Sequence, residues 1–289
     1  MIDFCGLELA HPVINGSGTF DAIAATRCFG DELAARFPFA AFVSKTITLA
    51  PRQGNRPPRL WETPAGMINS IGLPNRGLAG YVESDLPVLG RLGVPLITNV
   101  MGSSAAEFAE LIEALTDRPE VAAFELNVSC PNVRTGLDIG ADPRELQLLV
   151  RRIRPLTAKP VIVKLTPNCA DVAAAAVAAE EAGADAISLI NTLRAMGIGP
   201  DGRPWLGERF GGLSGPAVRA VAVAQVAAAA GRVGVPIVGM GGVSRGRDAA
   251  DLLDAGATLV AVGTENFRDP AAGARVAAEL EGILPQIAG

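Results

Sequence analysis

The stretch EAGADAISLIN (Glu181–Asn191) and the stretch DAGATLVAVGT (Asp254–Thr264) follow one pattern. In each, an alanine–glycine pair stands where a helix would end, and a short apolar strand comes directly after it. A repeated helix–turn–strand unit of this kind is typical of a (β/α)8 barrel, in which helices and parallel strands alternate. The rest of the chain is therefore expected to repeat the unit.

Short apolar runs do recur along the chain, and eight of them are predicted strands: Ala41–Lys45, Met67–Ile71, Pro95–Val100, Ala122–Asn127, Val161–Leu165, Ala186–Asn191, Pro236–Met240 and Leu259–Val262. Their almost continuous apolar character indicates a parallel sheet that is buried on both faces. A doubly wound open sheet would show similar strands, but the absence of a linker or a change of composition favours a TIM barrel formed by a single domain, residues 1–289. The first ~35 residues are expected to form a short antiparallel cap.

The predicted helices carry start signals. Ser104 followed by Glu107 has the spacing of a capping box, in which each side chain satisfies a backbone N–H group at the helix start. Proline stands where three helices are expected to begin, at Pro143, Pro216 and Pro270. These signals separate the strands by helices, as a barrel requires.

Composition limits the classes of partner. The chain has 289 residues, of which 49% are apolar and 4% aromatic, and its net charge is −5. Without a basic stripe, nucleic acids and anionic membranes are poor candidate partners. No apolar run approaches the ~18 residues that span a bilayer, and the N-terminal sequence MIDFCGLELAHPV does not resemble a signal peptide. We therefore expect a cytoplasmic protein.

Cysteine and histidine limit the chemistry further. The four cysteines, Cys5, Cys28, Cys130 and Cys169, include no Cys-x-x-Cys pair, so no metal or iron–sulfur site is predicted in this chain. The single histidine, His11, precedes Pro12 and is interpreted as a structural residue of an early turn. Proton transfer is therefore expected to use another kind of side chain.

Polar residues gather where the predicted strands end. These positions hold several asparagines, two lysines and a cysteine: Lys45, Thr46, Asn69, Ser70, Asn99, Asn127, Cys130, Asn132, Lys164, Asn191 and Thr192. Asparagine is a poor strand residue, and in a barrel the C-terminal strand ends form the active-site face. The set predicts a planar, hydrogen-bonding ligand. Lys164 could instead reach solvent, or form a Schiff base in a lyase.

Glycines follow the last two predicted strands, in GMGGV (239–243) and AVGTENF (261–267). Glycines let backbone N–H groups approach a phosphate, and barrels often bind phosphate in this region. The pattern is not the G-x-G-x-x-G of nicotinamide sites. A phosphate-bearing cofactor with a flat polar ring, such as flavin mononucleotide (FMN), fits the pattern, and plain tight turns are the alternative.

Ten motifs in order resemble one family, the class 1 dihydroorotate dehydrogenases: PVINGSGTF (12–20), SKTITLAPRQGN (44–55), NSIGLPN (69–75), TNVMGSS (98–104), ELNVSCPNV (125–133), VKLTPN (163–168), INTLRAMGI (190–198), GGLSGPAV (211–218), GMGGV (239–243) and VGTENF (262–267). The resemblance implies an FMN barrel that oxidises dihydroorotate to orotate in pyrimidine biosynthesis. It also gives a role to Cys130, which resembles the family's catalytic base that takes the C5 proton while a hydride leaves C6 for the flavin.

The same resemblance implies two sets of binding residues. Those expected to bind substrate are Lys45, Asn69, Ser70, Ile71, Gly72, Leu73, Asn127, Asn132, Asn191 and Thr192. Those expected to bind FMN are Ser17, Lys45, Thr46, Asn99, Asn127, Lys164, Ile190, Gly215, Gly241, Gly242, Gly263 and Thr264.

The subclass determines the electron acceptor. The segments TITL, INTLRAM and GGLSGPAV resemble class 1B, whose catalytic subunit pairs with a subunit that carries FAD and an iron–sulfur cluster and reduces NAD. A homodimeric core is expected. The segment Ala195–Gly199 departs from the family pattern. The alternatives are a class 1A enzyme linked to fumarate, an FMN enzyme for another dihydropyrimidine such as dihydrouracil, the Schiff-base lyase, and an inactive interaction module.

Overall fold

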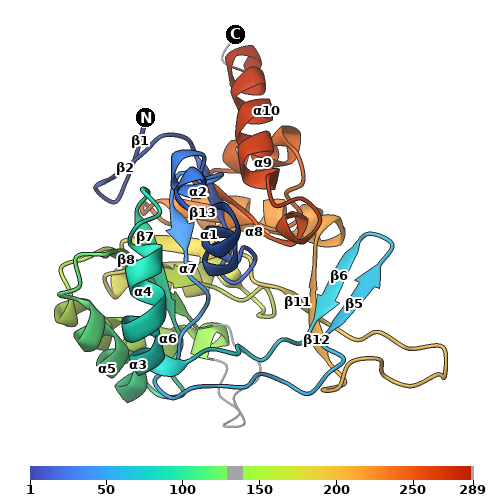
Figure 1. Ribbon diagram of the computed structural model, residues 1–289, viewed down its shortest axis with the longest axis horizontal. Coiled ribbons are helices and arrows are strands. Elements are labelled where there is room, and N and C mark those ends of the chain that lie inside the picture. The colour runs from blue at the N-terminus through green and yellow to red at the C-terminus, as the bar shows by residue number, and fades with distance from the viewer. Residues whose placement is uncertain (129–138, 288–289) are drawn as a thin grey trace.

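An eight-stranded parallel sheet forms the centre of the molecule (Figure 1). The computed structural model describes residues 1–128 and 139–287. The strands follow the order β3, β14, β13, β10, β9, β8, β7, β4 around the sheet. Their bounds are β3 (Val13–Asn15), β4 (Phe42–Val43), β7 (Leu96–Val100), β8 (Val121–Asn127), β9 (Val161–Lys164), β10 (Ala186–Leu189), β13 (Ile237–Met240) and β14 (Leu259–Val262). The predicted TIM barrel is confirmed.

The barrel is closed between β3 and β4 by a side chain. The amide of Asn15 donates to the carbonyl of Val43 at 2.8 Å and accepts from the N–H of the same residue, also at 2.8 Å. One backbone hydrogen bond, from the N–H of Ala40 to the carbonyl of Val13 at 3.0 Å, also connects these two parts of the barrel. Asn15 is fully buried, so its amide takes the place of a strand residue in this part of the ladder.

Replacement of Asn15 by leucine is expected to lower the free energy of unfolding by about 2–4 kcal/mol, because the N–H and C=O groups of Val43 would lose their partner in a buried place. Denaturant unfolding followed by circular dichroism measures the change. Gln147→Leu is the control, since that amide bonds Glu181 at the surface; its effect should stay within ~0.5 kcal/mol. An equal effect of both substitutions would contradict the closing role of Asn15.

The predicted N-terminal cap is confirmed in its first part. Strands β1 (Ile2–Phe4) and β2 (Leu7–Leu9) form an antiparallel hairpin. Phe4 and Leu9 pack with Ile14, Ala41 and other interior residues of the barrel strands, so the hairpin covers one end of the barrel. The cap is shorter than predicted, however, because Val13–Asn15 is already a barrel strand.

One predicted barrel strand was wrong. Met67–Ile71 overlaps β6 (Gly66–Asn69), which lies in a second, antiparallel sheet of order β11, β12, β6, β5. The other members are β5 (Leu60–Thr63), β11 (Leu193–Ala195) and β12 (Gly211–Ser214). Burial alternates along β6, as expected for a strand with one covered face. This sheet projects to one side of the barrel in Figure 1.

Helices surround the barrel and pack their apolar faces on it. The α-helices are α1 (Ala22–Phe29), α2 (Asp31–Ala35), α3 (Gly77–Gly80), α4 (Leu86–Leu89), α5 (Ala105–Leu115), α6 (Pro143–Ile153), α7 (Val172–Glu181), α8 (Arg219–Ala230), α9 (Gly246–Asp254) and α10 (Ala272–Ile287). A π-helical turn joins α3 to α4, at Tyr81–Asp85, and 3-10 turns lie at Ile139–Ala141, Arg154–Leu156, Pro216–Val218 and Thr264–Phe267.

The predicted helix ends are largely confirmed. Ser104 accepts from the N–H of Glu107, and Pro143 stands in the first turn of α6. Gly183 and Gly256 follow α7 and α9 with φ of +99° and +105°, a backbone conformation that favours glycine. Helix α10 begins two residues after Pro270, since residues 270 and 271 form a turn in which Asp269 accepts from the N–H groups of Ala271 and Ala272.

Candidate active site

A cavity of about 630 Å³ opens at the C-terminal ends of the barrel strands, where β6 and β12 of the antiparallel sheet form its roof. Of the predicted binding residues that the structure describes, all but Asn99 line it. They are Ser17, Lys45, Thr46, Asn69, Ser70, Ile71, Gly72, Leu73, Asn127, Lys164, Ile190, Asn191, Thr192, Gly215, Gly241, Gly242, Gly263 and Thr264. Cys130 and Asn132 lie outside the described residues. The topology therefore brings residues from distant parts of the chain to one cavity.

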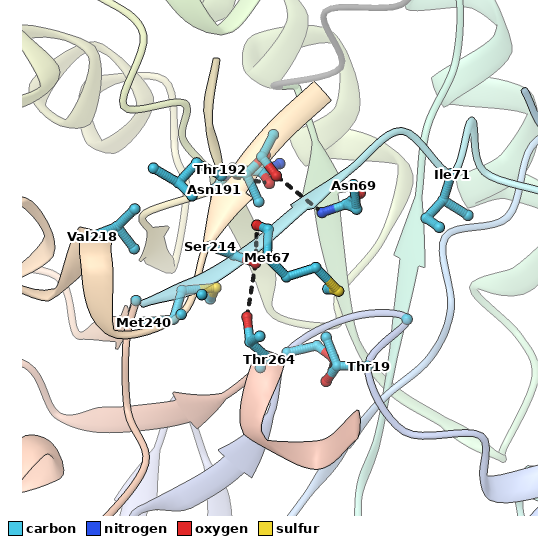
Figure 2. Close-up of a pocket in the computed structure, with 18 of the residues that line it drawn as sticks. Thr19, Met67, Asn69, Ile71, Asn191, Thr192, Ser214, Val218, Met240 and Thr264 are labelled. Carbon is cyan, nitrogen blue, oxygen red and sulfur yellow. Dashed lines mark hydrogen bonds between the residues drawn. The ribbon is translucent and has the colours of Figure 1, made fainter. Parts of the chain in front are cut away.

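Amide and hydroxyl groups gather at one end of this cavity. Figure 2 shows Asn69 of the roof strand β6 close to Asn191 and Thr192. The amide of Asn69 donates to the carbonyl of Gly212 at 3.3 Å, and the side chain of Asn191 accepts from the N–H of Thr192 at 2.8 Å. A Cβ atom on Gly212 would lie only 1.9 Å from the Thr192 hydroxyl, so the roof approaches this end closely because it has no side chain there.

A second group of polar side chains forms another wall of the cavity. Ser17 donates to the carbonyl of Ser44 at 2.8 Å and lies 3.4 Å from the Thr46 hydroxyl, and Asn127 donates to that hydroxyl at 3.3 Å. Lys45 follows Ser44, and its side chain is exposed on the cavity side. This wall therefore offers hydroxyl, amide and ammonium groups to a bound molecule.

Two glycine turns form the other end of the cavity. Gly241 and Gly242 follow β13 with φ of +134° and +76°, and a Cβ atom on Gly242 would lie 2.8 Å from the Cβ of Arg219. Gly263 and Thr264 follow β14, and the Thr264 hydroxyl donates to that of Ser214 at 2.8 Å. In Figure 2, Ser214 and Thr264 lie below the asparagine end. A Cβ atom on either glycine would meet α8, at Ala222 or Arg219, and Gly241 and Gly242 line the cavity with their backbone, which a phosphate group can approach.

The family model described as Dihydroorotate dehydrogenase matches residues 1–284. The chain belongs to the dihydroorotate dehydrogenase family. Among its relatives are proteins named dihydroorotate dehydrogenase B (NAD(+)), catalytic subunit. The one from Desulforudis audaxviator is 47% identical over 99% of this chain and 92% of its own length. Those from Geobacter metallireducens and Geobacter sulfurreducens are each 44% identical over 98% of this chain and 92% of their own length.

The class 1B resemblance seen in the sequence is thereby confirmed, since these relatives carry the NAD(+)-linked name. The fumarate-linked, dihydrouracil and Schiff-base alternatives are not favoured by the family match. No group of three or more His, Cys, Asp or Glu side chains that could hold a metal ion occurs among the described residues. In the same part of the chain, every helix is too short or too polar to cross a membrane.

The floor of the cavity contains a buried charge pair. The carboxylate of Glu125 accepts from the amide of Asn99 at 2.5 Å and from the Ser188 hydroxyl at 2.7 Å. The ammonium of Lys164 lies 3.9 Å from it. Asn99 is fully buried below the cavity, which explains why it does not line it. Glu125 was missed by sequence reasoning, although a glutamate inside the apolar run AAFELN is itself an unusual signal.

His11 and the three described cysteines lie away from the cavity. The Nδ1 atom of His11 accepts from the N–H of Val13 at 3.3 Å, and burial lowers the pKa of this imidazole. Burial also raises the pKa of the Cys5 thiol to about 11, so this thiol stays protonated near neutral pH. His11 therefore has the structural place in a turn that the sequence predicts.

Proposed function

We propose that this chain is the catalytic subunit of a class 1B dihydroorotate dehydrogenase, which oxidises dihydroorotate to orotate with FMN in pyrimidine biosynthesis. One observation carries the proposal: a single cavity, in a chain of this family, joins a glycine cradle to an end rich in asparagine. The cradle suits a phosphate, and the amide end suits a flat ring with several hydrogen-bonding groups. The cavity volume of about 630 Å³ is within the range of small-molecule sites.

The proposed FMN site uses the glycine turns and the second polar wall of the cavity. The backbone N–H groups around Gly241, Gly242, Gly263 and Thr264 would hold the phosphate. Thr46, Asn127, Lys164, Ile190 and Gly215, with Ser17, would line the rest of the flavin site. When bound, the flavin supplies a two-electron acceptor for the hydride that leaves C6 of the substrate.

The proposed substrate site combines the asparagine end with Asn127 and Lys45 of the second polar wall. Asn69, Asn127 and Asn191 each carry both a donor and an acceptor, so they can match the alternating N–H and C=O groups of a dihydropyrimidine ring. Lys45 would pair with the negative charge of the substrate carboxylate. Segment 70–73, Asn132 and Thr192 would complete the contacts. Cys130 is proposed as the general base, whose Sγ atom takes the C5 proton.

A partner subunit completes the proposed reaction cycle. The relatives are named as catalytic subunits, a name that implies a second subunit, and their activity is NAD(+)-linked. We infer that a subunit with FAD and an iron–sulfur cluster carries electrons from this chain to NAD, and that two copies of the chain form the core of the complex.

An anaerobic visible spectrum of the purified chain tests the proposal. Flavin absorbance should be present and should bleach when dihydroorotate is added. Extraction and chromatography should identify the flavin as FMN. Flavin absorbance that persists with dihydroorotate but bleaches with dihydrouracil would show that the substrate is a different dihydropyrimidine. Failure to bind FMN on reconstitution would overturn the proposal.

The partner needs an assay of its own. The chain alone is expected to reduce artificial dyes with dihydroorotate but not NAD, and addition of the co-expressed partner should restore NAD reduction. Rapid turnover with fumarate in the absence of a partner would instead indicate the class 1A reaction.

A further inference from the structure

Four polar residues occupy one layer of the barrel interior. Side chains alternate along a strand, so Glu125 on β8 shares the interior with Ala123, whereas Phe124 packs outward in the helix–sheet core. The same alternation places three further polar residues one step above interior apolar residues of their own strands: Asn99 above Ile97, Lys164 above Ile162, and Ser188 above Ala186. A polar layer therefore separates the apolar interior from the cavity.

Glu125 is the centre of this layer. Its side chain is 3% exposed, and each of its two carboxylate oxygens has a donor, Asn99 on one and Ser188 on the other. These two bonds fix the plane of the carboxylate, because both donors are themselves fully buried. A buried carboxylate is costly without a positive partner, and the Lys164 ammonium lies 3.9 Å away.

Lys164 connects this carboxylate to the cavity. Its side chain is 8% exposed, and it lines the cavity between Asn127 of β8 and the residues that end β10. A molecule bound in the cavity therefore meets an ammonium group whose positive charge is partly offset by Glu125 directly below it. Because the effective dielectric constant is low in a buried site, the Lys164 and Glu125 charges both change the electrostatic potential at that molecule.

We propose that Glu125 is a positioning residue that fixes the Lys164 ammonium at the cavity floor and sets the electrostatic potential, and with it the reduction potential, of the flavin bound above. The inference rests on the proposed function, because it takes the cavity to hold a flavin. Reduction adds negative charge to the flavin. The negative charge of Glu125 opposes that change, so its removal should favour the reduced form.

The variant Glu125→Gln removes the charge and keeps the shape. The glutamine can be accommodated because Asn99 Oδ1 has no hydrogen-bond partner and is free to accept from the new amide after rotation of the Asn99 side chain. The Ser188 hydroxyl can serve as donor or acceptor. A folded protein with bound flavin is therefore expected.

The midpoint potential of the bound FMN is measured by titration against a reference dye. In Glu125→Gln we expect reduced flavin to gain about tenfold in affinity over oxidised flavin relative to wild type, which raises the midpoint potential by about 30 mV for a two-electron couple. Ser188→Ala is the matched control, since it removes a hydrogen bond to Glu125 but no charge; its midpoint should stay near the wild-type value. Glu125→Asp, which retains the charge, should also stay near it.

An unchanged midpoint in Glu125→Gln, or an equal shift in Ser188→Ala, would overturn the inference. Either result would leave the proposed function intact if the wild-type flavin still bleaches with dihydroorotate. Failure of the Glu125 inference and failure of the proposed function are therefore distinguishable. If Glu125→Gln does not fold, the pair Lys164→Met and Lys164→Met/Glu125→Gln supplies the comparison, with FMN in excess. The double variant should have the higher midpoint potential, and equal midpoints would count against the role of Glu125.

Discussion

Cys130→Ala is expected to yield a folded, yellow protein whose flavin is reduced by dihydroorotate about 10²–10⁴-fold more slowly than in the wild-type chain. The reason is the loss of a positioned general base, whose contribution to rate is of this order. The residual rate would come from the binding groups of the asparagine end, which the substitution leaves in place. Anaerobic stopped-flow reduction at saturating dihydroorotate measures the effect, because it isolates the chemical step from reoxidation.

Two control variants sharpen this test. Cys169→Ala removes a thiol that lies outside the cavity and donates to the carbonyl of Thr166. The flavin of this variant should be reduced by dihydroorotate at the wild-type rate. Cys130→Ser places a hydroxyl where the thiol was. Because a hydroxyl can also take part in proton transfer, partial activity is expected. Reduction of Cys130→Ala at a rate close to wild type would remove Cys130 from the mechanism.

Much of the cavity was predictable because parallel strands place their C-terminal ends at the same edge of a sheet. Lys45, Asn127 and Lys164 lie far apart in the sequence, yet each follows or ends an apolar strand, so their convergence follows from the repeat alone. The glycine turns after β13 and β14 were predictable from the sequence for the same reason. The approximate C-terminal end of each strand was sufficient for this prediction. The exact first and last residues of the strands were not needed.

The first barrel strand was not predictable in this way. Strand β3 has only three residues, and a proline precedes it. Its pairing with β4 depends on the side chain of Asn15, and a sequence pattern does not show that an amide will replace a backbone ladder. Met67–Ile71 was the competing candidate because an apolar run looks alike in a barrel and in a one-sided sheet.

The roof and the polar layer were missed for two other reasons. Strand β12 has the sequence GGLS, and glycine is disfavoured in strands unless a neighbour approaches closely, as Thr192 does here. Glu125 and Asn99 face the interior, but which face of a strand is interior becomes known only when the closure of the barrel is known. Both features depend on contacts between distant parts of the chain.

Lys164→Met is expected to destabilise the chain without flavin by about 3 kcal/mol and to lower its affinity for FMN by about 10- to 100-fold. The first effect arises because Glu125 would keep a buried negative charge after removal of the cation that lies 3.9 Å from it. The second corresponds to the loss of one hydrogen bond from a charged donor to the flavin, about 1.5–3 kcal/mol. Denaturant unfolding of the flavin-free chain and fluorescence titration with FMN measure the two effects separately.

The double variant Lys164→Met/Glu125→Gln separates the two causes. It should recover most of the lost stability, because no uncompensated charge remains in the polar layer, but it should not recover FMN affinity, because the ammonium is still absent. Lys159→Met is the matched control: its ammonium donates to the carbonyl of Arg118 near the surface, so both measurements should change little. Wild-type stability and wild-type FMN affinity in Lys164→Met would contradict the pairing with Glu125 and the flavin contact alike.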